Sequence, residues 1–171
     1  MRKMPKRRGS ENKRLRPGEG SSLRAGFPAQ LVTLPSRVFC DTSFFYACFD
    51  VDDENHEHAE ELAEESARCG VSFLTTWDII SETTTLLRYR LGTTHAVTFL
   101  DEIKPTLTVI NYGDIARAEA EEIFRRRGRQ RRLSFCDAVS FVIVTRLLDD
   151  IPCFAFDRDF PTLGLTVIAG R

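Results

Sequence analysis

Four acidic residues occupy positions from which their carboxylates could meet at one edge of a parallel β-sheet. Asp41 directly follows the apolar segment 38–40, and Asp157 directly follows the apolar segment 153–156. Ligands of parallel α/β sheets gather beyond the carboxyl ends of the strands. Taken singly, Asp41 is better explained as a helix cap and Asp157 as a turn residue. As a pair, they predict a site at that edge.

A third acid, Asp137, lies near the start of a predicted apolar helix over residues 135–148. On a helical wheel its direction falls between those of Phe141, Val144 and Leu148. A buried, unpaired carboxylate is costly, so Asp137 needs a cation or a hydrogen-bond donor. The competing interpretation is an acid in the first turn, favoured by the helix dipole. Position alone does not choose between the two.

The fourth acid, Glu82, lies at the border of the apolar arc of a predicted helix over residues 77–89, beside Leu86. Alone, it would be placed in solvent. Four converging carboxylates would repel one another, and a hard divalent cation relieves that repulsion because Mg²⁺ and Mn²⁺ prefer oxygen ligands. The histidines fit surface or structural roles better than a competing site: His56, His58 and His95.

The elements that must position these acids alternate between strand and helix. Continuous apolar strand segments predict a parallel sheet covered on both faces, hence an α/β fold, a three-layer α/β/α sandwich with a mainly parallel central sheet. The predicted strands are 38–40, 71–75, 106–110, 153–156 and 165–168. The predicted helices are 44–49, 52–67, 77–89, 93–103, 114–127 and 135–148, and 157–161 is predicted to be a turn.

The charge distribution divides the 171-residue chain. Residues 1–37 hold ten Lys and Arg against two acids, whereas the rest holds fourteen against twenty-three, for a net charge of −1. We expect residues 1–30 to be a basic, disordered arm and residues 31–171 to be one domain. The five cysteines show no CxxC spacing, and no segment has the length and apolarity of a membrane span, so a cytoplasmic protein is expected.

Several motifs, in this order and spacing, resemble the PIN-domain family, especially the VapC-type toxin ribonucleases. The predicted strand over 38–40 is followed by Asp41 and then by the small hydroxyl residues Thr42 and Ser43. The pair Asp137 and Ala138 opens a buried helix, and Asp157, Arg158, Asp159 and Phe160 form an Asp-x-Asp-Phe motif. The likeness runs from about residue 38 to residue 168. Ala155 departs from it, because the family usually has Thr or Ser there.

The resemblance implies a PIN-like fold and a Mg²⁺- or Mn²⁺-dependent ribonuclease that hydrolyses RNA phosphodiesters. Asp41, Glu82, Asp137 and Asp157 would be both catalytic residues and metal ligands. Thr42 and Ser43 would support Asp41 by hydrogen bonds, and Asp159 would make outer contacts or cap a turn. A homodimer and a cognate antitoxin are implied partners.

Six arginines in eight residues precede the Asp137 helix, and contact with the RNA backbone is one explanation. A solvated loop, or a docking patch for acidic antitoxin residues, explains them equally well. The arginines are Arg125, Arg126, Arg127, Arg129, Arg131 and Arg132. Two other functions stay open: a stand-alone PIN nuclease for RNA processing or quality control, and a catalytically silent RNA- or protein-binding module.

Overall fold

The computed structural model describes residues 34–128 and 133–168. The predicted arm, residues 1–30, lies outside the described residues, as do Arg129, Arg131 and Arg132 of the arginine run. The description that follows concerns the described residues alone.

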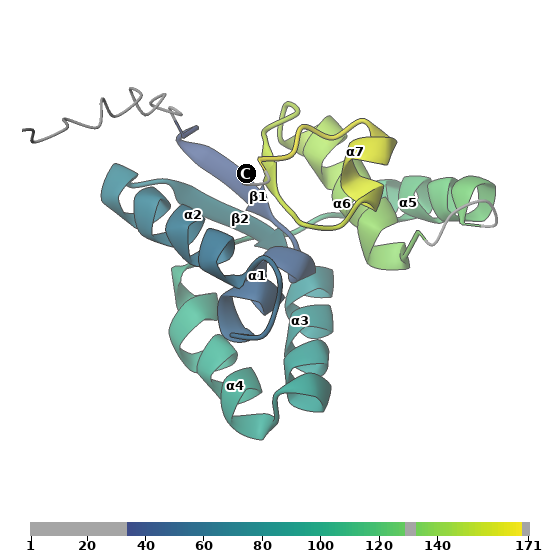
Figure 1. The fold of residues 1–171 in the computed structure, drawn as a ribbon. Helices are drawn as coiled ribbons and strands as arrows, with labels where there is room; N and C mark the ends of the chain where they lie inside the picture. Colours follow the sequence, from purple (N-terminus) through teal and green to yellow (C-terminus); the bar gives the residue numbers. More distant parts are fainter. Residues whose placement is uncertain (1–33, 129–132, 169–171) are drawn as a thin grey trace, which may run out of the picture. The chain divides into compact units, whose positions relative to one another are not determined.

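The centre of the fold is a four-stranded, all-parallel sheet (Figure 1). Its strands are β1 (Arg37–Cys40), β2 (Ser72–Thr76), β3 (Thr108–Ile110) and β4 (Cys153–Phe154), in the spatial order β3-β2-β1-β4. The registers pair Phe39 with both Leu74 and Cys153, so β1 lies between β2 and β4. The predicted parallel sheet is confirmed.

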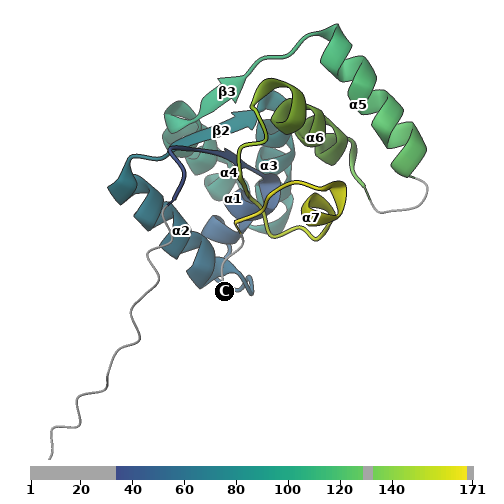
Figure 2. The ribbon, with the colours of Figure 1, turned by 90° about the horizontal axis from the view of Figure 1, so that it is seen from above.

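The crossovers place helices on both faces of the sheet. From β1 to β2 to β3 the chain steps toward one edge, and it then returns past β1 to β4. Because crossovers between parallel strands are right-handed, the reversal puts the last helices on the opposite face from the first (Figure 2). The first set is α1 (Thr42–Phe49), α2 (His56–Cys69), α3 (Trp77–Arg90) and α4 (Thr93–Thr98); the second is α5 (Asp114–Arg127) and α6 (Phe135–Leu147). This is the predicted α/β sandwich.

β2 and β3 are added on one side of β1, and β4 is added on the other side. The parallel strands β1 and β4 are therefore neighbours at the point where the strand order reverses. Such a switch point opens a crevice beyond the carboxyl ends of the strands, because the chain leaves neighbouring strands in different directions. Asp41 and Asp157 are the acids that follow β1 and β4 in sequence. The topology therefore brings two acids that are 116 positions apart to one place.

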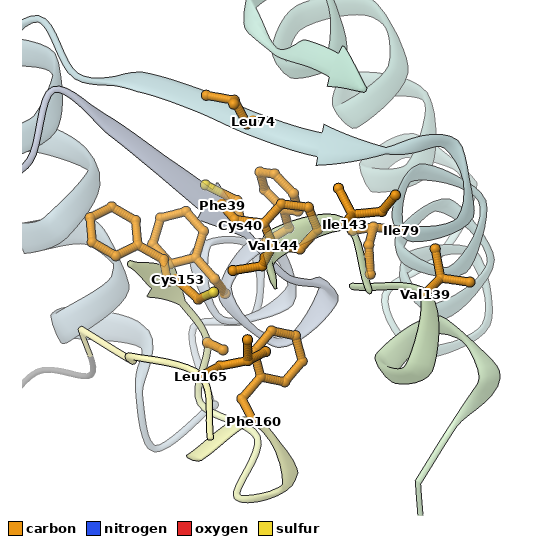
Figure 3. Close-up of a cluster of buried hydrophobic side chains, with 14 of the residues drawn as sticks. Phe39, Cys40, Leu74, Ile79, Val139, Ile143, Val144, Cys153, Phe160 and Leu165 are labelled. Atoms are coloured by element: carbon orange, nitrogen blue, oxygen red, sulfur yellow. The ribbon is translucent and has the colours of Figure 1, made fainter. Parts of the chain in front are cut away.

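The core that fixes this arrangement is apolar and closely packed around β1. Val38, Phe39 and Cys40 are fully buried. Figure 3 shows Phe39 and Cys153 of adjacent strands together with Val139 and Ile143 of α6. α6 buries most of its circumference, as its run of apolar residues predicts, so Asp137 in its first turn has little freedom to move.

Two predicted helices, those over 52–67 and 93–103, have wrong boundaries. The helix predicted over 52–67 begins only at His56, because the Asp50 and Asp53 side chains accept hydrogen bonds from the backbone N–H groups of Asp52 and Asn55 and form turns instead. The helix predicted over 93–103 ends at Thr98 and continues as a π-helical turn (Phe99–Ile103) and a 3₁₀ turn (Lys104–Thr106).

The C-terminal segment also differs from its prediction. The predicted turn at 157–161 is largely a short helix, α7 (Asp159–Leu163), which ends at Gly164 in the left-handed conformation that glycine favours. The predicted strand at 165–168 is reduced to a single bridge between Cys153 and Val167. β4 itself stops at Phe154, and two residues later the Phe156 N–H donates to the Ser43 hydroxyl.

Candidate metal centre and active site

A cavity of about 390 Å³ opens at the carboxyl ends of β1 and β4. All four predicted acids line it: Asp41, Glu82, Asp137 and Asp157. Asp53 adds a fifth carboxylate. Among the described residues, those that line this acidic pocket include no Lys, Arg or His. The structure thus gathers the predicted acids without a described cation beside them.

Asp41 is the most deeply held of these acids. It follows β1 and caps α1, and its Oδ2 accepts hydrogen bonds from the Ser43 N–H at 3.0 Å and the Ser43 hydroxyl at 2.6 Å. The side chain is nonetheless buried, and burial raises the pKa of the Asp41 carboxyl to about 7. The Ser43 hydrogen bonds oppose that shift in pKa, and the negative charge of Asp137 adds to it.

Ser43 joins the two strands that carry the first and last acids. Its hydroxyl donates to Asp41 and accepts a hydrogen bond of 2.9 Å from the backbone N–H of Phe156. Phe156 immediately precedes Asp157. The position of Asp157 is therefore tied, through one serine, to that of Asp41.

Asp137 opens α6 in a capping box with Ser134. The Ser134 hydroxyl accepts from the Asp137 N–H at 3.0 Å, and Asp137 Oδ2 accepts from the Ser134 N–H at 2.7 Å. Burial raises the pKa of the Asp137 carboxyl to about 6, the Ser134 hydrogen bonds oppose this, and the negative charges of Asp157 and Glu82 add to it. Asp137 is both a first-turn acid and a pocket acid, so the two interpretations of its position hold together.

Glu82 reaches the pocket from the first half of α3. Its Oε2 accepts a hydrogen bond of 2.7 Å from the Thr42 hydroxyl. Of the two hydroxyl residues expected to support Asp41, Ser43 does so, whereas the Thr42 hydroxyl supports Glu82 instead. The helical wheel left Glu82 between solvent and cleft; the structure makes it half-buried and places it in the acidic pocket.

Asp159 lies closer to the acids than its expected outer role suggests. One carboxylate oxygen from each of Asp137, Asp157 and Asp159 lies within 4.8 Å of the others. The Asp159 N–H donates to Asp157 Oδ1 at 2.9 Å, so it is Asp157 that caps the turn. Asp157, which lines the pocket, is exposed, and Asp159 is half-buried.

The donor set fits a hard divalent cation. Every charged group that lines the pocket, among the described residues, is a carboxylate, and two of these carboxylates are buried with raised pKa values. Oxygen ligands of this kind are those that Mg²⁺ and Mn²⁺ select. Asp41, Glu82, Asp137 and Asp157 are the residues that would hold such an ion.

Sequence reasoning missed several pocket residues. Ser134 carries a signal that points to it, because a serine three residues before an acid is the pattern of a capping box. Tyr46, Asn55 and Phe156 also line the pocket, and no local pattern distinguishes them from core or turn residues.

A second cavity, of about 550 Å³, runs along the outer face of α3 and shares Glu82 and Leu86 with the acidic pocket. Trp77 lines this cavity with 53% of its surface exposed. Lys104 lies over its ring at 4.9 Å from the centroid. Trp77 is therefore not a core residue.

Three members of the arginine run lie in the last turn of α5, where each already has a partner. Arg125 and Arg126 form exposed ion pairs with Glu121 and Glu122, and Arg127 lies over the ring of Phe141. Exposed pairs of this kind contribute little to stability and can be exchanged for another anion.

Of the described helices, none has the length and apolarity needed to span a membrane.

Comparisons with known proteins agree with this geometry. Residues 38–164 match the family described as the PIN domain. The crystal structure of VapC20 from Mycobacterium tuberculosis, described as a sarcin–ricin loop cleaving toxin, superimposes with a TM-score of 0.65 at 27% sequence identity. The match covers 75% of this chain and 96% of that one. A comparison with curated protein sequences gives no match.

Proposed function

This chain belongs to the PIN-domain family, and on that premise we propose that it is a metal-dependent endoribonuclease acting as the toxin of a VapBC-type pair. The observation that carries the proposal is the pairing of Asp41 and Asp137. Both carboxyls are buried in one pocket and have raised pKa values, and no described cation lines that pocket. A fold keeps such a costly arrangement where a cation binds during function.

The pocket acids would have two roles: to bind the metal ion and to orient the attacking water. Asp41, Glu82 and Asp137 are fixed by hydroxyl or backbone donors and would hold Mg²⁺ or Mn²⁺, with Asp157 completing the set. When bound, the ion supplies Lewis-acid chemistry, lowering the pKa of the attacking water and offsetting charge on the phosphodiester. The exposed carboxylate of Asp157 could also accept a hydrogen bond from that water and orient it.

The toxin role rests on the likeness to VapC20 and on the motifs shared with VapC-type nucleases. A cognate antitoxin and a homodimer are proposed partners on the same ground. The exposed Trp77 and Tyr89 rings along α3 suit a surface that a protein partner covers. A small neighbouring reading frame encoding a DNA-binding N-terminus would separate a toxin from a stand-alone RNA-processing nuclease.

RNA contact by the arginine run is a proposal based on charge. Arg125, Arg126 and Arg127 can leave exposed or side-chain partners for phosphate, and in the sequence the run continues after α5 with Arg129, Arg131 and Arg132. Phosphate contact of this kind makes RNA affinity fall steeply as salt rises.

The decisive experiment is RNA cleavage by purified full-length protein in Mg²⁺, in Mn²⁺ and in EDTA. We expect metal-dependent cleavage of a mixed tRNA and rRNA pool, lost by about 10²-fold or more in Asp41→Asn and in Asp137→Asn, because each removes a charged ligand. Asp101→Asn is the matched control, because Asp101 is an exposed aspartate outside the pocket.

Cleavage that persists in EDTA, or in the Asp41→Asn and Asp137→Asn variants, would contradict the proposal and indicate a contaminant or another mechanism. Absence of cleavage by folded protein that binds Mn²⁺ would instead favour the silent binding module.

A further inference from the structure

Two threonine hydroxyls form a chain behind Glu82. The Thr83 hydroxyl lies 3.3 Å from the Thr42 hydroxyl, and the Thr42 hydroxyl donates to Glu82 Oε2 at 2.7 Å. Thr83 is fully buried and Thr42 is buried. Thr83 follows Glu82 in α3 and does not line the acidic pocket, and its hydroxyl is directed to Thr42.

The donor and acceptor capacities of the three groups determine the direction of both hydrogen bonds. An ionised Glu82 carboxylate can only accept, so Thr42 must donate its one proton to it. With that proton committed, the Thr42 oxygen can only accept, and Thr83 must be its donor. Each hydroxyl in the chain therefore has one orientation.

The neighbouring threonine shows what Thr83 does differently. A threonine within a helix commonly donates to the carbonyl four residues earlier, and Thr84 does so, bonding the Ile80 carbonyl oxygen at 2.7 Å. The Thr83 hydroxyl bonds across to Thr42 in α1 instead. Its hydrogen bond thus joins two helices directly behind the pocket.

The half-buried Glu82 needs this support more than the two buried aspartates do. Its side chain is longer than that of an aspartate and would lose more rotamer freedom on being fixed. Asp41 and Asp137 each bond a serine within three residues in the chain, whereas the hydroxyl that holds Glu82 comes from another helix. Among the described residues, Glu82 Oε1 has no hydrogen-bond donor, which leaves that oxygen for a ligand.

We propose that Thr83 is a positioning residue: it orients the Thr42 hydroxyl toward Glu82 and so sets how Glu82 meets a divalent cation. This inference rests on the proposed function, because it concerns the same acidic pocket. It adds a residue that contacts neither the ion nor the substrate.

The test is the affinity of the full chain for Mn²⁺, measured by the electron paramagnetic resonance of the free ion. Thr83→Val keeps the shape and removes the donor. We expect its Mn²⁺ affinity to fall about 10-fold, at the lower end of the effect of groups that orient metal ligands. Thr83→Ser restores the hydroxyl and should restore affinity. Thr84→Val, the same change at the next position of α3, should leave affinity unchanged.

A double-mutant cycle separates positioning from packing. If Thr83 acts through Thr42, Thr83→Val should cause no further loss of Mn²⁺ affinity once Thr42→Val is present. Losses that multiply would overturn the inference, as would a Thr83→Val protein with wild-type affinity. If Thr83→Val folds poorly, the comparison of Thr83→Ser with Thr83→Ala decides the question by the same measurement.

RNA cleavage measured on the same proteins distinguishes the two proposals. The half-saturating Mn²⁺ concentration should rise in Thr83→Val by the same factor, with an unchanged KM for RNA. Wild-type cleavage together with an unaffected Thr83→Val overturns the positioning role alone. Mn²⁺ affinity that depends on Thr83, in a protein that cleaves no RNA, overturns the nuclease alone. A wild-type protein that binds no Mn²⁺ overturns both.

Discussion

Burial of the Asp41 and Asp137 carboxyls makes the stability of the fold depend on pH. The carboxyl pKa is raised from about 3.8 to about 7 in Asp41 and to about 6 in Asp137, and in both burial is the largest cause. In the unfolded chain both groups ionise near the ordinary value. The folded protein therefore binds more protons than the unfolded one between these pH values.

We expect the metal-free protein to lose stability as pH rises from about 4 to about 7, because a raised folded pKa favours the native state only while the group is protonated. For Asp41 the loss is on the order of 4 kcal/mol. Urea unfolding in EDTA at several pH values measures it. Mg²⁺ should restore more stability at pH above about 7 than at pH near 5, because the ion binds the ionised carboxylates.

Asp41→Asn is the control for that slope, since it removes the larger of the two titrations. Its free energy of unfolding should depend less on pH over the same interval. A wild-type stability that stays level or increases between about pH 4 and about pH 7 would contradict the assignment of buried, unpaired carboxyls.

For single residues, the sequence predicts which acids belong to the site better than it predicts the hydrogen-bond partners of the site residues. Asp137 could be placed beside a buried stripe because helical spacing defines direction on a helix. The partner of Thr42 could not be predicted, because it depends on how α1 packs on α3. The same holds for Thr83, whose hydroxyl makes its bond between helices.

Among the elements, α6 has the clearest dependence on a single residue. Ser134 caps the helix that carries Asp137. We expect Ser134→Ala to lower the free energy of unfolding by about 1 kcal/mol and Ser134→Gly to lower it by only a few tenths of that amount, as is usual at helix N-caps. Urea denaturation of both variants measures the difference.

Cleavage should survive in both Ser134 variants at a reduced rate. The backbone N–H of residue 134, which donates to Asp137 Oδ2, persists whatever the side chain. Equal destabilisation by Ala and Gly, or none by either, would show that the capping box does not stabilise α6.

Apolar elements were predictable and the polar segments between them were not. The α6 helix and the strand β1 are continuously apolar, and both form close to their predicted positions. The segment before His56 has helical composition, but its aspartates bond the backbone in turns. Near the C-terminal end, residues 165–168 have strand composition, yet after α7 and the Gly164 cap they form a single bridge.

For the domain as a whole, alternation of strands and helices was enough to predict a parallel sheet, and the order of its strands determines the site. The predicted convergence of Asp41 and Asp157 is confirmed, because β1 and β4 are neighbours. The composition of the pocket could not be predicted in full. Tyr46, Asn55 and Phe156 reach it through loop and helix geometry that appears only in three dimensions.

The hydrogen bond between Ser43 and Phe156 spans 113 positions of the chain. Contacts this distant in sequence form slowly, since a long loop must close first. On dilution from urea, we expect helical circular dichroism to recover before Mn²⁺ binding. Simultaneous recovery of both signals would contradict this. A newly made chain would thus pass through a latent interval, with its helices formed and its acidic pocket incomplete, before the proposed cleavage of RNA could begin.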